Sequence, residues 1–356
     1  MPDAMTDPFS PTLALAPFGD DALRQRVQAA LDAKTKPLGA LGRLEALALQ
    51  LACVQNRDRP RLEAPQLVVF AADHGIAAQG VSAYPSEVTR QMVLNFLAGG
   101  AAVSVLARQH GVAVTVADCG VAAEFDAHAQ LRRLKVDGAE RGTADASRGP
   151  AMTEAQCAAA IANGRRLMAG LPGNVLLLGE MGIGNSSAAA LLMARLTAEP
   201  LEHCVGRGTG LDDAGLAHKR GVLQRALAAN AQATAPLQAL AALGGLEIAS
   251  MVGAVQQAGA DGRVIVVDGF ITTAAVAVAA ALQPALLQRC VFAHRSQETG
   301  HTRWLQQLGA APLLDLDLRL GEGSGAALAW PLLESACRVL GEMASFASAG
   351  VSGRAG

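Results

Sequence analysis

Residues 174–187 read Asn-Val-Leu-Leu-Leu-Gly-Glu-Met-Gly-Ile-Gly-Asn-Ser-Ser, an apolar run that ends in a glycine-rich turn and leads into an alanine-rich stretch. The continuous apolar run predicts a strand that is buried on both faces, and the alanine-rich stretch predicts a helix. The same order recurs along the chain, where short apolar runs end in acidic or glycine residues. These further runs are 67–71, 112–117, 264–267 and, less clearly, 285–293.

Apolar strands that alternate with helices are typical of a parallel sheet covered by helices on both faces. We therefore predict an α/β fold. Ligands bind such sheets outside the carboxyl ends of the strands, which is where this sequence places its acidic residues and glycines. Before the first strand, residues 21–55 predict helices interrupted near Pro37, and the last ten residues predict a disordered tail.

Composition excludes several classes of protein. The 356-residue chain carries 29 Lys and Arg against 31 Asp and Glu, with no block of like charge. A nucleic-acid or membrane-surface binder would need a basic patch. The apolar runs are too short or too broken to span a bilayer, and the first residues do not resemble a signal peptide. The six cysteines lie far apart without a C-x-x-C pair, so we expect a cytoplasmic protein with reduced thiols and no zinc cluster.

The turn at 179–187 is the clearest candidate site. Its glycines let a ligand approach the backbone, Ser186 and Ser187 can donate hydroxyls, and free N–H groups at the start of the next helix attract a phosphate. The turn matches neither Walker A nor G-x-G-x-x-G, and a merely tight strand-to-helix turn remains the alternative. Residues 205–210 and Lys219 offer a second donor-rich loop, for which a solvated surface loop is the alternative.

Two acidic segments carry further candidate side chains. Asp73 and His74 end the first predicted strand and allow a metal or acid–base interpretation, although a structural role is commoner. We expect no catalytic metal, because H-E-x-x-H and a second His or Asp group at ligand spacing are missing. Glu322 lies between glycines before an apolar helix that starts at residue 326. It is either a helix cap or a general base whose pKa an apolar pocket raises.

Taken together, these segments resemble the nicotinate-nucleotide:dimethylbenzimidazole phosphoribosyltransferases of cobalamin biosynthesis. The matching stretches follow the family's order and are 36–42, 72–75, 87–92, 179–187, 206–210, 268–270, 294–300 and 321–325. Ala40 stands where the family has Ser, and Ser186-Ser187 where Thr-Thr is usual. Neither difference removes a charge or closes a pocket.

The resemblance implies a doubly wound, mostly parallel sheet in a Rossmann-like, three-layer arrangement, with a smaller helical subdomain from both chain ends. We expect an N-terminal arm, this subdomain, the α/β domain and a flexible tail, over residues 1–20, 21–60 plus 326–346, 61–325 and 347–356. The implied enzyme is a homodimer without metal or other cofactor. It moves the phosphoribosyl group of nicotinate mononucleotide to 5,6-dimethylbenzimidazole by inverting displacement, which gives α-ribazole 5′-phosphate and nicotinate.

The resemblance also implies roles for particular residues. Glu322 matches the general base that takes the imidazole N–H proton, and Glu180 matches a second carboxylate near the sugar. The residues expected to bind substrate are Gln91, Gly182, Gly184, Asn185, Ser186, Gly208, Lys219, Asp268 and Ser296. Among them, residues 182–186 match the phosphate cradle and Gln91 matches the base pocket.

Three other functions stay open at this point. The same scaffold could act on another base, such as adenine or a phenol. A non-catalytic nucleotide sensor would show a degraded acid at position 322 or a broken loop at 179–187, and both are intact. Hydride transfer needs a dinucleotide fingerprint after the first strand, which residues 70–75 lack.

Overall fold

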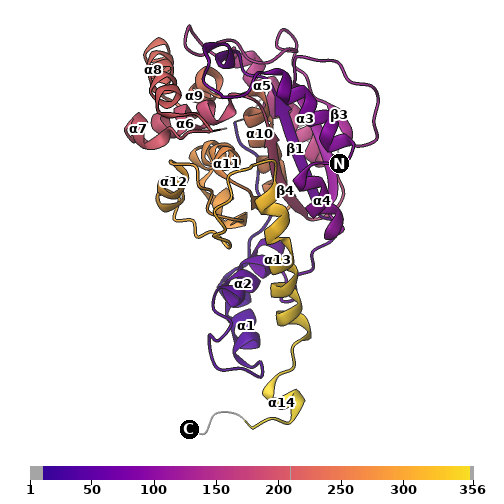
Figure 1. Cartoon of the computed structure of the whole chain (residues 1–356). Coiled ribbons are helices and arrows are strands. Elements are labelled where there is room, and N and C mark those ends of the chain that lie inside the picture. The colour runs from indigo at the N-terminus through magenta and orange to yellow at the C-terminus, as the bar shows by residue number, and fades with distance from the viewer. Residues whose placement is uncertain (1–10, 209, 353–356) are drawn as a thin grey trace.

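The sheet that the sequence predicts is present and entirely parallel. The structure, a computed structural model, describes residues 11–208 and 210–352. Its one sheet has the strand order β3-β2-β1-β4-β5-β6, and helices pack around it (Figure 1). The strands are β1 (Gln66–Ala72), β2 (Ala113–Gly120), β3 (Leu131–Arg133), β4 (Val175–Met181), β5 (Val264–Val267) and β6 (Cys290–Phe292). The predicted α/β class is therefore confirmed.

Helices connect and cover the strands. They are α1 (Asp21–Asp32), α2 (Arg43–Gln55), η1 (Gly75–Gln79), α3 (Glu87–Leu97), α4 (Ala102–Gln109), α5 (Glu154–Ala169), α6 (Asn185–Thr197), α7 (Leu201–Cys204), α8 (Asp213–Ala229), α9 (Pro236–Leu243), α10 (Leu246–Ala260), α11 (Phe270–Leu282), η2 (Pro284–Arg289), α12 (His301–Gln307), α13 (Ser324–Glu342) and α14 (Phe346–Ala349). The elements η1 and η2 are 3₁₀ helices.

Alternate residues of the central strands enter two separate hydrophobic cores. Phe70 of β1 belongs to the core that α5, α6, α9, α10 and α11 build on one face of the sheet. Its neighbour Val69 belongs to the other core, which α3, α4 and α13 complete. Because all seven residues of β1 are buried, the strand has no polar face and appears in the sequence as an unbroken apolar run. Helix, sheet and helix form the three expected layers.

The strand order reverses at the centre of the sheet. The chain moves outward from β1 through β2 to β3, then returns to β4 and moves outward the other way through β5 and β6. The two connections leave the β1–β4 pair in opposite directions, which opens a crevice at the carboxyl ends of these strands. Ligands of doubly wound proteins bind at such a switch point, so the fold places a candidate site beside residues 72–75 and 179–185.

Helices from the two chain ends pack together below the sheet. Helix α13 packs on α2, and α2 packs on α1, and Figure 1 shows the three as a projection from the α/β body. The segments beyond them also meet, because Thr35 N–H donates to the Ala344 carbonyl (3.1 Å) and Phe346 N–H donates to the Ala33 carbonyl (3.0 Å). These helices are the ones that the sequence assigns to a small subdomain.

The described parts of the predicted arm and tail are ordered by hydrogen bonds. Ala16 N–H donates to the Gly259 carbonyl (3.2 Å), and Gly19 N–H donates to the Cys53 carbonyl (2.8 Å). The tail, expected to be disordered from residue 347, begins instead as α14, whose N-terminus Ser345 caps by accepting from Ser348 N–H. Residues 1–10 of the arm and 353–356 of the tail lie outside the described residues.

Two strands differ from the prediction. Strand β3 was not expected, because it is a three-residue edge strand whose Arg132 and Arg133 are exposed and leave no apolar run. The weak strand at 285–293 is confined to β6, because Pro284 starts a 3₁₀ helix that occupies the first half of that segment.

One stretch, Glu87–Gln109, is long and apolar enough to cross a membrane by length and composition. In the structure it is divided into α3 and α4, and the turn between them includes Gly99 in the left-handed region (φ 76°). Both helices contribute residues to the core that covers β1, and 33% of the 18-residue apolar window is buried.

Candidate functional site

An open cavity of about 270 Å³ lies at the carboxyl edge of the sheet. The loops that follow β4, β5 and β6 line it together with the segment that precedes α13. Its described lining includes eight of the predicted site residues, which are Glu180, Gly182, Gly184, Asn185, Ser186, Gly208, Ser296 and Glu322. The fold thus brings together residues from four widely separated parts of the sequence.

The phosphate cradle expected at 182–186 forms the start of α6. Gly184 precedes the helix in the left-handed region (φ 100°) and Asn185 begins it. The N–H groups of Asn185 and Ser187 donate to the carbonyls of Gly182 (3.1 Å) and Gly184 (2.9 Å), which leaves the N–H groups of Gly184 and Ser186 as the donors of this turn without a partner among the described residues. Ile183 N–H is held by the Thr89 hydroxyl at 3.1 Å. On the other side, the Lys219 ammonium donates to the Ser186 hydroxyl at 2.9 Å. This set of donors suits a phosphate.

Two glycines of this region have no room for a side chain. A methyl group on Gly182 would overlap the Ala72 carbonyl oxygen, and one on Gly208 (φ 53°) would press on the Ser186 hydroxyl and the Lys219 ammonium. Glycine at these positions is therefore required by close packing of the β1 and β4 ends and by the approach of the 206–210 loop. Thr209 of that loop lies outside the described residues.

Lys219 is buried, with 1% of its surface exposed. Burial lowers the pKa of its ammonium to about 8, although the negative charge of Glu298 acts to raise it. A buried ammonium whose described hydrogen-bond partner is one hydroxyl gains strongly from an incoming anion. Lys219 is therefore well suited to bind a phosphate at the cradle.

Two carboxylates face the cavity next to the cradle. Burial, with a further contribution from the charge of Asp268, raises the pKa of Glu180 to about 8. The same two causes raise the pKa of Glu322 to about 7. Asp268 itself is buried beneath them, and its carboxylate accepts hydrogen bonds from Gly323 N–H (3.2 Å) and Ala326 N–H (2.9 Å) at the start of α13. A carboxyl group poised near neutral pH can exchange a proton with a substrate.

Glu322 has an uncommon backbone conformation. Its φ is 67°, and the flanking Gly321 and Gly323 have φ values of 78° and 90°. A non-glycine residue in the left-handed region costs free energy that the surrounding contacts must offset. Here the Glu322 N–H donates to Glu180, and a methyl group on Gly179 would overlap the Glu322 carbonyl. The structure therefore fits Glu322 better as a positioned functional group than as a side-chain cap of α13.

The segment after β6 contributes His294 and Ser296, and α12 contributes His301. The Ser296 N–H donates to Nδ1 of His301 at 2.9 Å, and burial lowers the pKa of His301 to about 3, so this ring is neutral. His294 lines the cavity, and its Nε2 lies 3.6 Å from Asp268. Neither ring nitrogen of His294 has a hydrogen-bond partner among the described residues.

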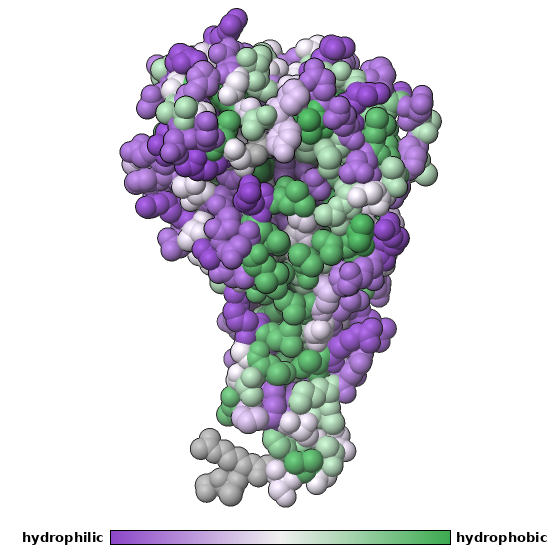
Figure 2. Space-filling view, in the orientation of Figure 1, coloured by the Kyte–Doolittle hydropathy of each residue, from purple (hydrophilic) through white to green (hydrophobic). Residues whose placement is uncertain are grey.

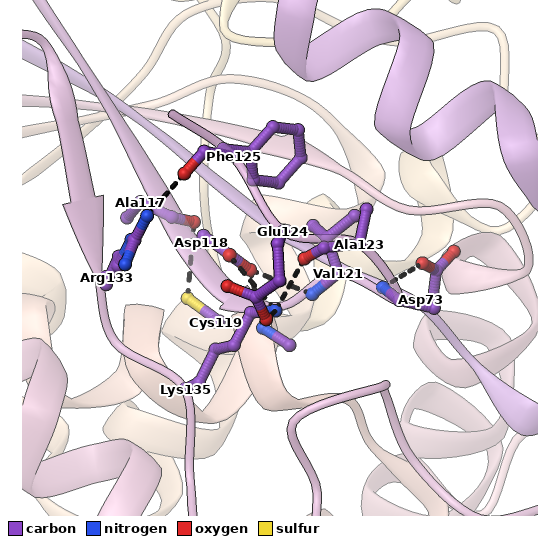
Figure 3. A network of polar contacts seen from close by, with 12 residues as sticks. Asp73, Ala117, Asp118, Cys119, Val121, Ala123, Glu124, Phe125, Arg133 and Lys135 are labelled. Atoms are coloured by element: carbon purple, nitrogen blue, oxygen red, sulfur yellow. Dashed lines mark hydrogen bonds and ion pairs between the residues drawn. The ribbon is translucent and has the colours of Figure 1, made fainter. Parts of the chain in front are cut away.

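Asp73 and His74 lie behind the phosphate cradle. The His74 Nε2 and the Glu247 carboxylate form a fully buried pair at 2.7 Å, and a methyl group on Gly182 or Gly184 would lie 3.3 Å from atoms of the His74 side chain. Asp73 accepts from Ala122 N–H at 2.8 Å, which ties the turn after β2 to the end of β1 (Figure 3). Asp118 holds the same turn by accepting from Val121 N–H. Asp73 and His74 therefore support the backbone of the candidate site from behind.

Three expected site residues are not part of the cavity lining. Lys219 and Asp268 lie next to the lining residues Ser186 and His294. Gln91, in contrast, does not reach the cavity. It is exposed on α3 and is not part of the lining.

Conversely, Glu298 and Arg319 line the cavity without having been expected. Glu298 lies inside the matching stretch 294–300, and Arg319 lies just before the matching stretch 321–325. The positions of these motifs were therefore the signal that could have pointed to both residues. The described residues contain no group of three or more His, Cys, Asp or Glu that could hold a metal ion.

Comparison with known proteins agrees with this geometry. The family model DBI_PRT, described as a phosphoribosyltransferase, matches residues 16–351. A protein of Variovorax paradoxus named nicotinate-nucleotide–dimethylbenzimidazole phosphoribosyltransferase is 64% identical, over 98% of this chain and 99% of its own. A protein of Cupriavidus necator with the same name is 60% identical, over 94% of this chain and 96% of its own. The crystal structure of CobT from Thermus thermophilus superposes with a TM-score of 0.87 at 44% identity, covering 93% and 99% of the two chains.

Proposed function

This chain belongs to the DBI_PRT family of phosphoribosyltransferases, and from that premise we propose that it transfers the phosphoribosyl group of nicotinate mononucleotide to 5,6-dimethylbenzimidazole. The products are α-ribazole 5′-phosphate and nicotinate. The observation that carries the proposal is the pairing, in one cavity, of a phosphate cradle with two carboxylates whose pKa values lie near neutrality. The names of the relatives supply the identity of donor and acceptor.

The cradle binds the 5′-phosphate of the donor. The N–H groups of Gly184 and Ser186, the Ser186 hydroxyl and the Lys219 ammonium are the donors that it offers. Fixing the phosphate places the ribose over the carboxylates, and binding energy from this remote group orients the reacting carbon. No metal is assigned to the site.

Glu322 acts as the general base. One nitrogen of the benzimidazole attacks the anomeric carbon and forms the new C–N bond. The bond between the anomeric carbon and the pyridinium nitrogen breaks. Its electron pair stays on that nitrogen, which is neutral in the released nicotinate. The proton on the second imidazole nitrogen passes to the Glu322 carboxylate. Attack opposite to the leaving group converts the β-linkage of the donor into an α-linkage.

Glu180 stabilises the positive charge of the donor. The nicotinate ring is a pyridinium in the donor, and displacement passes through an oxocarbenium-like sugar. A cation near Glu180 favours its ionised form and opposes the effect of burial on its pKa. Asn185, which donates to the Glu180 carboxylate, holds that group in place.

The homodimer and the cytoplasmic location are parts of the same proposal. Figure 2 shows hydrophobic residues gathered in a band from the middle of the molecule toward the helical projection. Monomeric proteins rarely expose a continuous band of this kind, which supports association of two copies through this face.

A nicotinate-release assay tests the proposed reaction. Purified protein with nicotinate mononucleotide should release nicotinate only when 5,6-dimethylbenzimidazole is present, and NMR should identify an α-linked product. Glu322→Gln should fold normally and turn over about 10²–10⁴-fold more slowly, since a positioned general base contributes that much. Full activity of Glu322→Gln would remove Glu322 as the base, and no release from folded protein with any base would remove the transferase.

A further inference from the structure

The candidate cavity is rich in carboxylates and poor in cations. Glu180, Glu298 and Glu322 line it, and Arg319 is the one Lys or Arg among its described lining residues. Lys219 reaches the cavity only through the Ser186 hydroxyl. An anionic group that enters the cavity away from the cradle therefore meets carboxylates unless it lies beside Arg319.

The proposed donor carries two anionic groups at opposite ends. The 5′-phosphate is served by the cradle and Lys219. The second group is the carboxylate on the pyridine ring, and the cradle cannot bind it while it holds the phosphate. Desolvating an unpaired carboxylate near three others would be costly. The ring carboxylate requires a cation of its own.

Arg319 is available for this purpose. Burial raises the pKa of the Glu298 carboxyl, which also lines the cavity, and the charges of Lys219 and Arg319 act to lower it. The Arg319 guanidinium makes no hydrogen bond or ion pair within 4 Å among the described residues. The nearby Arg295 is already engaged by Asp315 at 2.7 Å. Guanidinium binds carboxylate in a planar, two-bond geometry that lysine cannot reproduce. The side chain is exposed, so it can also release the nicotinate product.

The backbone that carries Arg319 is fixed at the rim of the cavity. The segment before it runs beside the end of β6, with Arg295 N–H donating to the Leu314 carbonyl (2.9 Å) and Gln297 N–H donating to the Leu318 carbonyl (2.9 Å). Two residues later the chain reaches Gly321 and the base Glu322. Arg319 and Glu322 thus lie on one short segment. Arg319 offers a cation to the leaving nicotinate, and Glu322 offers a base to the attacking benzimidazole.

We propose that Arg319 pairs with the ring carboxylate of the donor and makes the enzyme select nicotinate mononucleotide over its nicotinamide counterpart. This inference rests on the proposed function. The nicotinamide nucleotide has the same ribose phosphate but a neutral carboxamide on the ring, so it isolates the charge that Arg319 recognises.

The test compares the two donors in wild-type protein, Arg319→Gln, Arg319→Lys and the control Arg338→Gln. Arg338 is 70% exposed on α13, far along the chain from the cavity residues, and pairs with Glu342. Arg319→Gln should lower kcat/KM for the nicotinate donor about ten- to a hundredfold, mainly through KM, and leave the nicotinamide donor unchanged. Arg319→Lys should restore part of the loss, and Arg338→Gln should match the wild type.

Binding of each donor, measured by calorimetry, gives a second readout that does not need turnover. An equal loss for both donors would overturn the inference, because it would assign Arg319 to the shared phosphate or to folding. An unchanged preference would overturn it as well. Wild-type protein that binds both donors but never releases nicotinate would instead count against the proposed function, and the binding preference would still decide the role of Arg319.

Discussion

The backbone N–H of Glu322 donates a hydrogen bond to Oε1 of Glu180, 3.3 Å away. The two residues are 142 positions apart in the chain and both face the cavity. The bond joins the end of β4, which leads into the proposed phosphate cradle, to the loop before α13 that carries the proposed base. Catalysis by positioned groups depends on such a fixed relation, since small displacements reduce the rate strongly.

Gly179→Ala should separate the end of β4 from the loop that carries Glu322. A methyl group at Gly179 would overlap the backbone carbonyl of Glu322, and neither backbone can yield without moving the base. We expect a loss of about 1–3 kcal/mol in the free energy of unfolding and a larger fractional loss of turnover. Urea unfolding and the nicotinate-release assay measure the two effects.

Gly221→Ala is the matched control for that change. Gly221 lies inside α8, with open space where a side chain would be. Alanine there should raise stability by up to about 1 kcal/mol and leave turnover unchanged. If Gly179→Ala behaved like Gly221→Ala, the close packing of Gly179 against the Glu322 backbone would have no role in catalysis.

The pH profile should report the ionisation of Glu322. The base must be deprotonated, and its pKa is raised to about 7, so kcat/KM should rise as the pH passes through that value. Above about pH 8 it should fall again, because the free protein loses the Lys219 charge that binds the donor phosphate. Asp268→Asn removes a negative charge that contributes to the raised pKa, and the rise should therefore move to lower pH. A profile in Asp268→Asn that coincides with the wild-type profile would exclude this electrostatic coupling.

Affinity for phosphate should fall at alkaline pH. Burial lowers the pKa of Lys219 to about 8, so the free protein loses the ammonium charge as the pH rises through that value. Inhibition by inorganic phosphate should weaken above about pH 8. Lys219→Met should bind phosphate more weakly at every pH and lose this dependence, and a persisting dependence would point to another group.

The His74–Glu247 pair should stabilise the fold most at low pH. Burial alone would lower the pKa of His74, but the charge and hydrogen bond of Glu247 raise it above its ordinary value. A raised histidine pKa contributes stability below the unfolded value of about 6.5, and the contribution is lost as pH rises through the folded value.

Glu247→Gln should therefore lower the free energy of unfolding by about 3–5 kcal/mol below pH 6.5, with a smaller loss at higher pH. Urea unfolding at several pH values checks this. A loss that is the same at all pH values would mean that His74 is neutral in the native protein.

The sequence predicts the central fold because β1 and β4 are buried on both faces, and only unbroken apolar runs satisfy that environment. It does not reveal β3, since an edge strand of three residues with exposed arginines needs no apolar pattern. Local patterns also cannot pair His74 with Glu247, because 173 positions separate them. Their contact depends on how α10 packs on the sheet.

The candidate site, too, could be predicted from the sequence only in part. Glycine spacing marks the cradle and the loop of Glu322, because close backbone approach leaves glycine as the residue that fits. Arg319 has no such mark, since an exposed arginine in a polar loop is ordinary. Gln91 stands in a matching motif on α3 but is exposed and does not line the cavity, so the motif match alone did not place it there.

The helical projection has a consequence for how the protein is made. Lys34 and its contact at Met343 are 309 residues apart, and ribosomes add about 5–20 residues per second. Helices α1 and α2 therefore leave the ribosome about 15–60 s before the helix that covers them. During that time Leu47 and Leu51 of α2, which are buried in the finished protein, lack the packing of α13 on that helix and are open to chaperones. Because Glu322 is also synthesised late, a nascent chain holds all residues of the proposed phosphate cradle but lacks the proposed base until translation is nearly finished.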